Sequence, residues 1–454
     1  MAARLPSVWK RFSSTITPRA APPKAHHHAP IPDSAFPAGY AVTGLHCGIK
    51  KTGAPDLAVI LSTSPRPTSA AACFTRNAFK AAPVVVSEEV LNANDGRARA
   101  IVVNSGCANA VTGKKGMEDA WSMVRATDAL LESPPKEKSE TLVMSTGVIG
   151  VNLPISKILT GIQSQSKEGK TLGSTFDAWE RAAKAFMTTD TFPKLRAHTF
   201  TVNGKEYRIA GMDKGAGMIH PDMGPPRSSG QLHATLLGCI LTDAAVSSRS
   251  LQSALTYAVD RSFNSISVDG DMSTNDTIVV LANGAATGGS DTQEIDEQRD
   301  PTAYTTFRDA LTTFAAELAQ LVVRDGEGAT KFVTVSVQGA ATYEDAHRIA
   351  SRISTSALVK TALYGEDANW GRILAAAGAV PLSKPLDPAR VNVSFIPTDG
   401  SPALPLLING EPETVDEVRA KQILSVEDLA IQVELGLGSQ SAKYWTCDFS
   451  YCVR

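Results

Sequence analysis

A threonine stands at the start of an apolar run in residues 234–243, which read "ATLLGCILTD". A threonine hydroxyl is a weak nucleophile unless a base lies next to it. If the chain is cut between Ala234 and Thr235, the new α-amino group is such a base, with a reference pKa of about 7.7–8.0. Strand propensity alone favours a structural role for Thr235, because β-branched residues pack well at strand positions. The stretch therefore allows either a self-cleaving nucleophile or ordinary strand packing.

A second candidate for chemistry is "STGVIG" at residues 145–150, where an apolar strand ends. Gly147 lets another group approach the backbone closely. The hydroxyl of Thr146 beside a backbone N–H can form an oxyanion hole, which stabilises negative charge on a reacting carbonyl oxygen. The alternative is a plain turn between a strand and a loop.

A lysine precedes two glycines in "MDKGAGMIHPDMG", residues 212–224. A cation at a flexible glycine turn suits a carboxylate ligand. The spacing does not match a phosphate-binding P-loop. Lys214 is therefore a candidate carboxylate ligand, and a solvated turn residue is the alternative.

Two further motifs favour structural roles. The stretch "SVDGDMSTNDT" (267–277) resembles a calcium loop in its first positions, but Thr274 replaces the required glycine and Val280 replaces the final glutamate. Turns closed by Asp, Asn and Ser side chains explain it better. In "GEDANWGR" (365–372), packing at a corner is favoured over a place in a pocket.

Alternating strands and helices must position these motifs. Strands are predicted at residues 57–63, 82–87, 99–106, 140–145, 277–283 and 331–337. Helices are predicted at residues 116–132, 175–190, 251–264, 304–323 and 344–363. Asn203-Gly204 predicts a hairpin turn, and the polar residues 285–301 predict a surface excursion. The order indicates an α/β or α+β layered protein rather than a regular Rossmann alternation.

Composition narrows the class of protein. The chain has 454 residues, 43% of them hydrophobic, which suffices for a substantial core. A net charge of −2 gives no indication of a nucleic-acid partner. No apolar run reaches the length of a membrane span. The 6 cysteines contain no C-x-x-C pair, so free thiols are expected rather than a zinc site or a disulfide scaffold.

The first 32 residues differ from the rest, because they contain five basic residues and no acidic one. This composition is typical of a mitochondrial transit peptide, and a disordered tail is the alternative. The consecutive residues His26, His27 and His28 are interpreted as incidental rather than as a metal site.

From about residue 38 onward, nine segments occur in a specific order. They are "GIKK…DLAVI", "VVNSGCANA", "STGVIG", "MTTDT-PK", "KGAGMIHPDM", "ATLLGCILTDAAV", "SFNSISVDGDMSTNDT", "RDGEGATKF" and "GEDANWGRI". Together they resemble the bifunctional ornithine acetyltransferase / N-acetylglutamate synthase family of arginine biosynthesis. The resemblance implies a fold of two β-sheets between helices, with an N-terminal threonine nucleophile that self-processing exposes.

The resemblance also implies site residues. The precursor cuts itself between Ala234 and Thr235, so residues 33–234 become an α chain and residues 235–454 a β chain that stay together as one catalytic unit. By the same resemblance, Thr235 is expected to accept the acetyl group, and Thr146 and Gly147 are expected to form the oxyanion hole. The implied substrate-binding residues are Thr188, Lys214, Thr235 and Glu327.

The implied reaction is a ping-pong exchange between N-acetylornithine and glutamate through acetyl-Thr235. Acetyl-CoA is the expected second acetyl donor, as a co-substrate, and no metal or bound cofactor is expected. The other implied partners are the small-molecule substrates and the chain's own fragments, as two α and two β chains. The implied location is the mitochondrial matrix, and neither a nucleic acid nor a membrane is an expected partner.

Two departures from the family pattern stand out. Ten residues, "GPPRSSGQLH", separate Met223 from Ala234 where shorter members pass almost directly to the cleaved bond. They predict an exposed loop and a self-processing rate that is equal or slower. At the other end, "SYCVR" offers no counterpart to the asparagine and the Ser/Thr with which the family tail completes the substrate site.

Two other functions remain open at this point. A self-processing hydrolase, similar to aminopeptidases of related architecture, would use the same nucleophile with water as the acceptor. Ornithine distinguishes them, because a transferase yields N-acetylornithine and a hydrolase yields acetate alone. The second is a non-catalytic protein that stays uncut.

Overall fold

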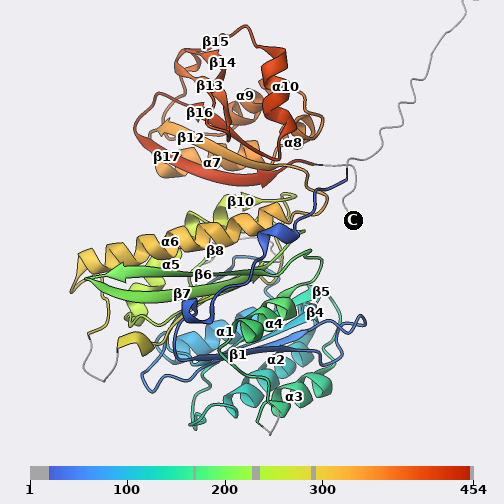
Figure 1. Cartoon of the computed structure of the whole chain (residues 1–454), viewed down its shortest axis with the longest axis vertical. Helices are drawn as coiled ribbons and strands as arrows, with labels where there is room; N and C mark the ends of the chain where they lie inside the picture. Colours follow the sequence, from blue (N-terminus) through green and yellow to red (C-terminus); the bar gives the residue numbers. More distant parts are fainter. Residues whose placement is uncertain (1–19, 167–169, 227–235, 288–292, 450–454) are drawn as a thin grey trace, which may run out of the picture.

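Two β-sheets pack face to face in the first two thirds of the chain (Figure 1). The computed structural model describes residues 20–166, 170–226, 236–287 and 293–449. The four-stranded sheet has the order β1 (Tyr40–Leu45), β2 (Leu57–Ser62), β4 (Ala100–Cys107), β5 (Thr141–Val148). The six-stranded sheet has the order β6 (Lys194–Val202), β7 (Lys205–Lys214), β9 (Leu237–Thr242), β11 (Thr277–Ala282), β3 (Ser69–Thr75), β8 (Met223–Gly224).

Strand periodicity explains how each sheet serves two cores. Successive side chains of a strand point to opposite faces. In β9, Cys239 and Leu241 lie in the core between the sheets, whereas Ile240 lies in the core under the outer helices. All six residues of β9 are buried, as expected for a strand that is covered on both faces.

Helices cover both outer faces, which confirms the predicted layered arrangement. The outer face of the four-stranded sheet packs against α2 (Gly113–Asp128) and α3 (Ile155–Ser164). The outer face of the six-stranded sheet packs against α5 (Ser248–Asp260) and α6 (Pro301–Arg324). The helix α4 (Phe176–Phe186) packs on β1 and also contacts β7 of the other sheet. No helix among the described residues is long and apolar enough to cross a membrane.

A third sheet with its own core follows (Figure 1, top), and the sequence patterns did not reveal it. Its order is β10 (Ile266–Ser267), β17 (Gln440–Cys447), β12 (Phe332–Ala340), β16 (Asp428–Glu434), β13 (Asn392–Pro397), β14 (Leu404–Ile408), β15 (Glu411–Pro412). Its helices are α7 (Tyr343–Ser354), α8 (Ala357–Tyr364), α9 (Gly371–Gly378) and α10 (Glu417–Ser425). The strand β10 lies between β9 and β11 in the chain, and it pairs with β17. This pairing connects the six-stranded sheet's part of the chain directly to the third sheet.

Three element predictions need correction. Residues 82–87 belong to the helix α1 (Ala82–Ala93), because Pro83 fits the first turn of a helix and Val84, Val86 and Val90 are buried by packing. The predicted helix 344–363 is two helices, since the hydroxyl of Ser356 accepts the N–H of Val359 and starts a new one. Residues 285–301 are not wholly superficial, because Ile295 is buried and bridges Val246.

The segment before the first sheet packs on the body of the protein. The Lys24 ammonium lies 2.6 Å from Glu427 and has little exposed surface. The His28 ring lies 3.0 Å from Glu180 of α4. Residues 20–32 are therefore ordered against the rest of the chain, whereas the predicted leader over residues 1–32 stays a prediction. Residues 1–19 lie outside the described part of the chain.

The five cysteines in the described ranges, Cys47, Cys73, Cys107, Cys239 and Cys447, are free thiols, as predicted. Cys452 lies outside the described residues. Burial raises the pKa of Cys73 and of Cys239 to about 12, so these thiols stay protonated. Within the same ranges no cluster of three potential metal ligands occurs.

Candidate active site

A cavity of about 510 Å³ opens where β4 and β5 end. The predicted residues Thr146, Gly147 and Thr188 line it, together with Lys50. Three exposed apolar side chains, Val148, Ile149 and Met218, form another part of its walls. A mostly apolar cavity with a few convergent polar groups is typical of a small-molecule site.

Backbone geometry explains why a glycine follows Thr146. The pairing of β4 with β5 shifts register at Gly106 and Cys107, which forms a local irregularity at the cavity wall. Gly147 has φ +126°, a conformation that favours glycine. A Cβ there would lie 2.3 Å from the carbonyl carbon of Gly106. The two strands can meet this closely only because residue 147 has no side chain.

Lys214 is a buried residue rather than a solvated turn residue. It is the last residue of β7 and pairs with Leu237 at the start of β9. Its ammonium nitrogen lies 3.4 Å from the hydroxyl oxygen of Thr146. Burial lowers its pKa, although Asp190 and other carboxylates oppose this effect. The hairpin around Asn203-Gly204, which is confirmed, delivers this lysine to the entrance of β9.

Glu327 approaches the same region from the end of α6. Its backbone N–H donates to the carbonyl of Ala216 at 2.8 Å. Its carboxyl carbon lies 2.9 Å from where a Cβ on Gly217 would stand. The Glu327 carboxylate therefore lies close against Gly217, and a side chain at position 217 would displace it.

The acidic loop 267–277 shapes the site, and no calcium ligation is needed to explain it. The Asp269 carboxylate accepts the N–H groups of Met218 at 2.6 Å and Ile219 at 3.0 Å. The Asn275 side chain donates to the carbonyls of Ala108 at 2.6 Å and Ser145 at 2.7 Å. The loop thus joins two walls of the cavity, and the rejection of a calcium loop is consistent with these contacts.

Asp276 is a buried carboxyl that sequence reasoning missed. One oxygen accepts the backbone N–H of Leu236, and the other has no partner among the described residues. Burial raises the pKa of Asp276 well above its usual value, although Leu236 and Lys214 oppose this effect. The only sequence signal was its place in the "STNDT" motif.

The proposed cleavage residues, Ala234 and Thr235, lie outside the described part of the chain, as does most of the inserted segment before them. Leu236, the next residue, is described. It lies at the entrance of β9 between β7 and β11, and its carbonyl accepts the N–H of Thr277 at 3.0 Å.

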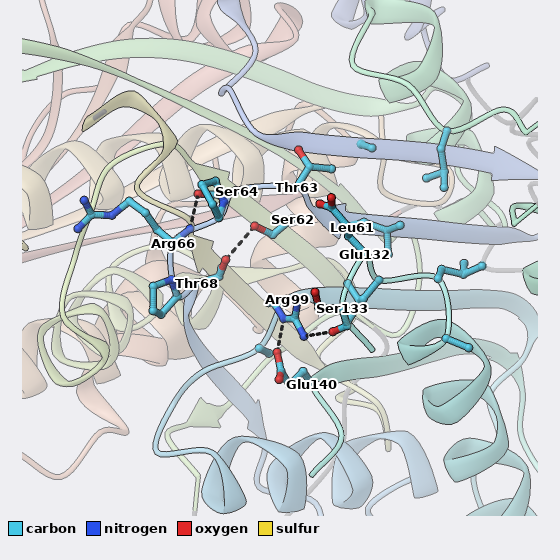
Figure 2. Close-up of a pocket in the computed structure, with 18 of the residues that line it drawn as sticks. Leu61, Ser62, Thr63, Ser64, Arg66, Thr68, Arg99, Glu132, Ser133 and Glu140 are labelled. Atoms are coloured by element: carbon cyan, nitrogen blue, oxygen red, sulfur yellow. Dashed lines mark hydrogen bonds and ion pairs between the residues drawn. The ribbon is translucent and has the colours of Figure 1, made fainter. Parts of the chain in front are cut away.

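A larger cavity, with a volume of about 1120 Å³, lies elsewhere (Figure 2). Its polar groups largely satisfy one another. Arg99 pairs with Glu140 and donates to the carbonyl of Ser133 at 2.8 Å, and the hydroxyls of Ser62 and Thr68 are 2.8 Å apart. None of the predicted site residues that the structure describes, namely Thr146, Gly147, Thr188, Lys214 and Glu327, lines it. Size alone therefore does not identify the site.

The "GEDANWGR" segment has the structural role that was favoured. Glu366 pairs with Lys331 at 3.4 Å, and Arg372 donates to the carbonyl of Leu358 at 2.7 Å. Trp370 packs against the core of the third sheet. None of these residues lines the cavity that contains Thr146.

Known proteins resemble this chain along almost its whole length. A sequence model described as the ArgJ family matches residues 41–452. A Postia placenta protein named arginine biosynthesis bifunctional protein ArgJ, mitochondrial, is 81% identical over 99% of this chain and 98% of its own length. A Laccaria bicolor protein of the same name is 70% identical over 98% of this chain and 97% of its own length. A crystal structure of a Bacillus halodurans protein named arginine biosynthesis bifunctional protein ArgJ is 36% identical, covers 46% of this chain and 92% of its own, and has a TM-score of 0.41.

Proposed function

The chain belongs to the ArgJ family, and from this premise we propose a role in acetyl transfer for each of its predicted site residues. The protein is a mitochondrial acyltransferase of arginine biosynthesis. It exchanges acetyl between N-acetylornithine and glutamate, and it also acetylates glutamate from acetyl-CoA. The observation that supports the assignment of residues is the 3.4 Å approach of Lys214 to Thr146 where the chain enters β9.

Self-cleavage is the first proposed step. The hydroxyl oxygen of Thr235 attacks the carbonyl carbon of Ala234, the C–N bond between them breaks, and the nitrogen takes up the proton. Water then hydrolyses the resulting ester, which leaves a carboxylate on Ala234 and a free α-amino group on Thr235. That amino group serves afterwards as the base for its own hydroxyl.

The transfer then proceeds in two halves. The Thr235 oxygen attacks the acetyl carbonyl of N-acetylornithine while the α-amino group takes its proton. The acetyl C–N bond breaks, and ornithine leaves with that proton on its amine. The α-amine of glutamate attacks the acetyl ester, N-acetylglutamate leaves, and the Thr235 oxygen regains a proton. Thr146 and Gly147 stabilise the negative oxygen in both halves.

Charge complementarity supports the remaining roles. Lys214 pairs with a substrate carboxylate, Glu327 orients an amine, and Thr188 contributes a hydroxyl at the cavity wall. Neither a bound metal nor a cofactor is part of this mechanism. The assembly we propose is two α and two β chains.

Acceptor choice tests the transferase function against the hydrolase. With N-acetylglutamate as donor, we expect ornithine to be converted to N-acetylornithine in amounts equal to the glutamate released. A chromatographic assay of both products measures this ratio. Release of acetate that is unaffected by ornithine would instead support a hydrolase, and an uncut protein without turnover would support the inactive alternative.

Lys50 predicts a pH dependence of substrate binding. Its loop wraps around Asp56, which accepts the N–H groups of Cys47, Ile49 and Lys50 at 2.7 to 3.0 Å. Burial lowers the pKa of Lys50 to about 8, with Lys214 acting in the same direction and Asp56 and Asp190 opposing it. Lys50 is therefore charged below pH 8 and neutral above it, so attraction for substrate carboxylates is lost as the pH rises.

We expect KM for glutamate to rise about tenfold between pH 7 and pH 9.5. The arginine variant Lys50→Arg keeps its charge over this range, so its KM should stay flat. In Lys50→Met the KM should be high at every pH. Initial-rate measurements across the range check this, and the same rise in Lys50→Arg would exclude Lys50 as the titrating group.

A further inference from the structure

A fully buried ion-pair cluster lies behind the cavity and is not used by the proposed mechanism. Its centre is Lys194, the lysine of the "MTTDT-PK" motif. The ammonium nitrogen lies 2.6 Å from a carboxylate oxygen of Asp190 and 2.6 Å from one of Asp325. None of the three side chains has exposed surface. Burying three charges costs free energy, so a gain in stability does not by itself explain why such a cluster is present.

Asp190 holds two of the proposed substrate-binding loops. The oxygen that pairs with Lys194 also accepts the N–H of Gly215, the residue after Lys214, at 2.7 Å. The other oxygen accepts the N–H of Thr188 at 2.8 Å. Burial alone would raise the pKa of Asp190, but Lys194 and Lys214 hold it well below its usual range, so it stays ionised.

Asp325 holds the third loop, which carries Glu327. It follows the last residue of α6, and its two oxygens accept the hydroxyl and, at 2.9 Å, the N–H of Thr191. Burial alone would lower the pKa of Lys194, but Asp190 and Asp325 raise it, so this lysine keeps its charge. One buried cation therefore connects the loops that carry Thr188, Lys214 and Glu327.

We propose that Lys194 is a positioning residue that fixes these three substrate loops relative to one another. It touches no substrate and acts through Asp190 and Asp325. The inference rests on the proposed function, because that function gives the three loops their roles. If the chain is cut before Thr235, Lys194 and Asp190 lie in the α chain and Asp325 in the β chain, so the cluster also joins the two fragments across the site.

The test compares Lys194→Met with Lys24→Met. In the full-length chain Lys24 is also a buried lysine, and it pairs with the partly exposed Glu427 away from the cavity, so both variants remove a buried ammonium group from an ion pair. We expect Lys194→Met to raise KM for both N-acetylornithine and glutamate at least about tenfold. Lys24→Met should keep wild-type KM values, and its loss of thermal stability is measured beside that of Lys194→Met. Equal KM values in the two variants would overturn the proposal.

A second variant covers the case in which Lys194→Met does not fold. Asp325→Asn keeps the shape of the side chain, removes one ion pair, and should also raise both KM values. Where the double variant Lys194→Met/Asp325→Asn folds, its KM should exceed the higher of the two single-variant values by no more than about twofold. Both changes disrupt the same ion-pair cluster, so their effects should not add. Wild-type KM values in Asp325→Asn would overturn the proposal. A failure of the proposed function can be distinguished from a failure of this proposal. If the proposed function is wrong, the wild-type protein itself will show no cleavage or no acetyl transfer, before any variant is compared.

Discussion

Replacing Thr235 by alanine leaves the chain uncut and reduces acetyl transfer by roughly 10⁴-fold or more, as expected when a nucleophile is removed. Alanine has no oxygen to attack the preceding carbonyl, so the peptide bond before it stays intact. The α-amino group that would serve as the base is then never released. Denaturing electrophoresis and intact mass, measured beside the initial rate, check both parts.

Thr235→Ser is the matched control, because it keeps a hydroxyl at the same position. We expect it to be cut, and to retain part of the transferase rate. A wild-type chain that remains uncut, or an alanine variant that is still cut at the same bond, would contradict the assignment of Thr235. Because this residue lies outside the described part of the chain, the experiment tests it independently of the geometry around it.

Replacing Thr146 by valine has the second largest expected effect, a loss of roughly 10² to 10³ in kcat, or about 3 kcal/mol. Valine fills nearly the same volume at this fully buried position but removes the hydroxyl. That hydroxyl is proposed to stabilise charge that develops only in the transition state, so KM should change little. Single-turnover rates of acetyl transfer, with KM measured in parallel, check this.

Thr146→Ser keeps the hydroxyl and serves as its control, with kcat expected within a few-fold of wild type. The serine variant also shows whether the loss of a methyl group alone disturbs this buried position. If the valine and serine variants are equally active, the hydroxyl has no part in stabilising the oxyanion. A rise in KM with unchanged kcat would point instead to a role in substrate binding.

Local pattern predicted most of the strands and helices in the layered part. The apolar runs at 99–106 and 277–283 are the central strands β4 and β11, because a strand covered on both faces is apolar throughout. The valine-rich run at 82–87 is instead a helix. There a β-branched composition competes with Pro83 and with tertiary packing, and the sequence pattern alone does not show which prevails.

The site could be predicted in part. The motifs identified Thr146, Gly147 and Thr188, which share a cavity, and Lys214, which lies behind Thr146. Sequence reasoning missed Asp276 and the Lys194 cluster. Lys194 and Asp325 are separated by 131 positions, and a single sequence carries no signal that two distant charges will meet. The buried state of these groups is likewise a property of the packed chain.

By itself, the sequence determined the family, the layered class of fold and the motifs that are proposed to carry the chemistry, because these depend on residue types and on spacing along the chain. Only the tertiary structure decided that a third sheet adds a separate core, that Gly147 must lack a side chain, and that Lys194 links three loops. The physical reason is that burial and charge pairing depend on contacts between segments far apart in the chain, which form only when the sheets and helices pack.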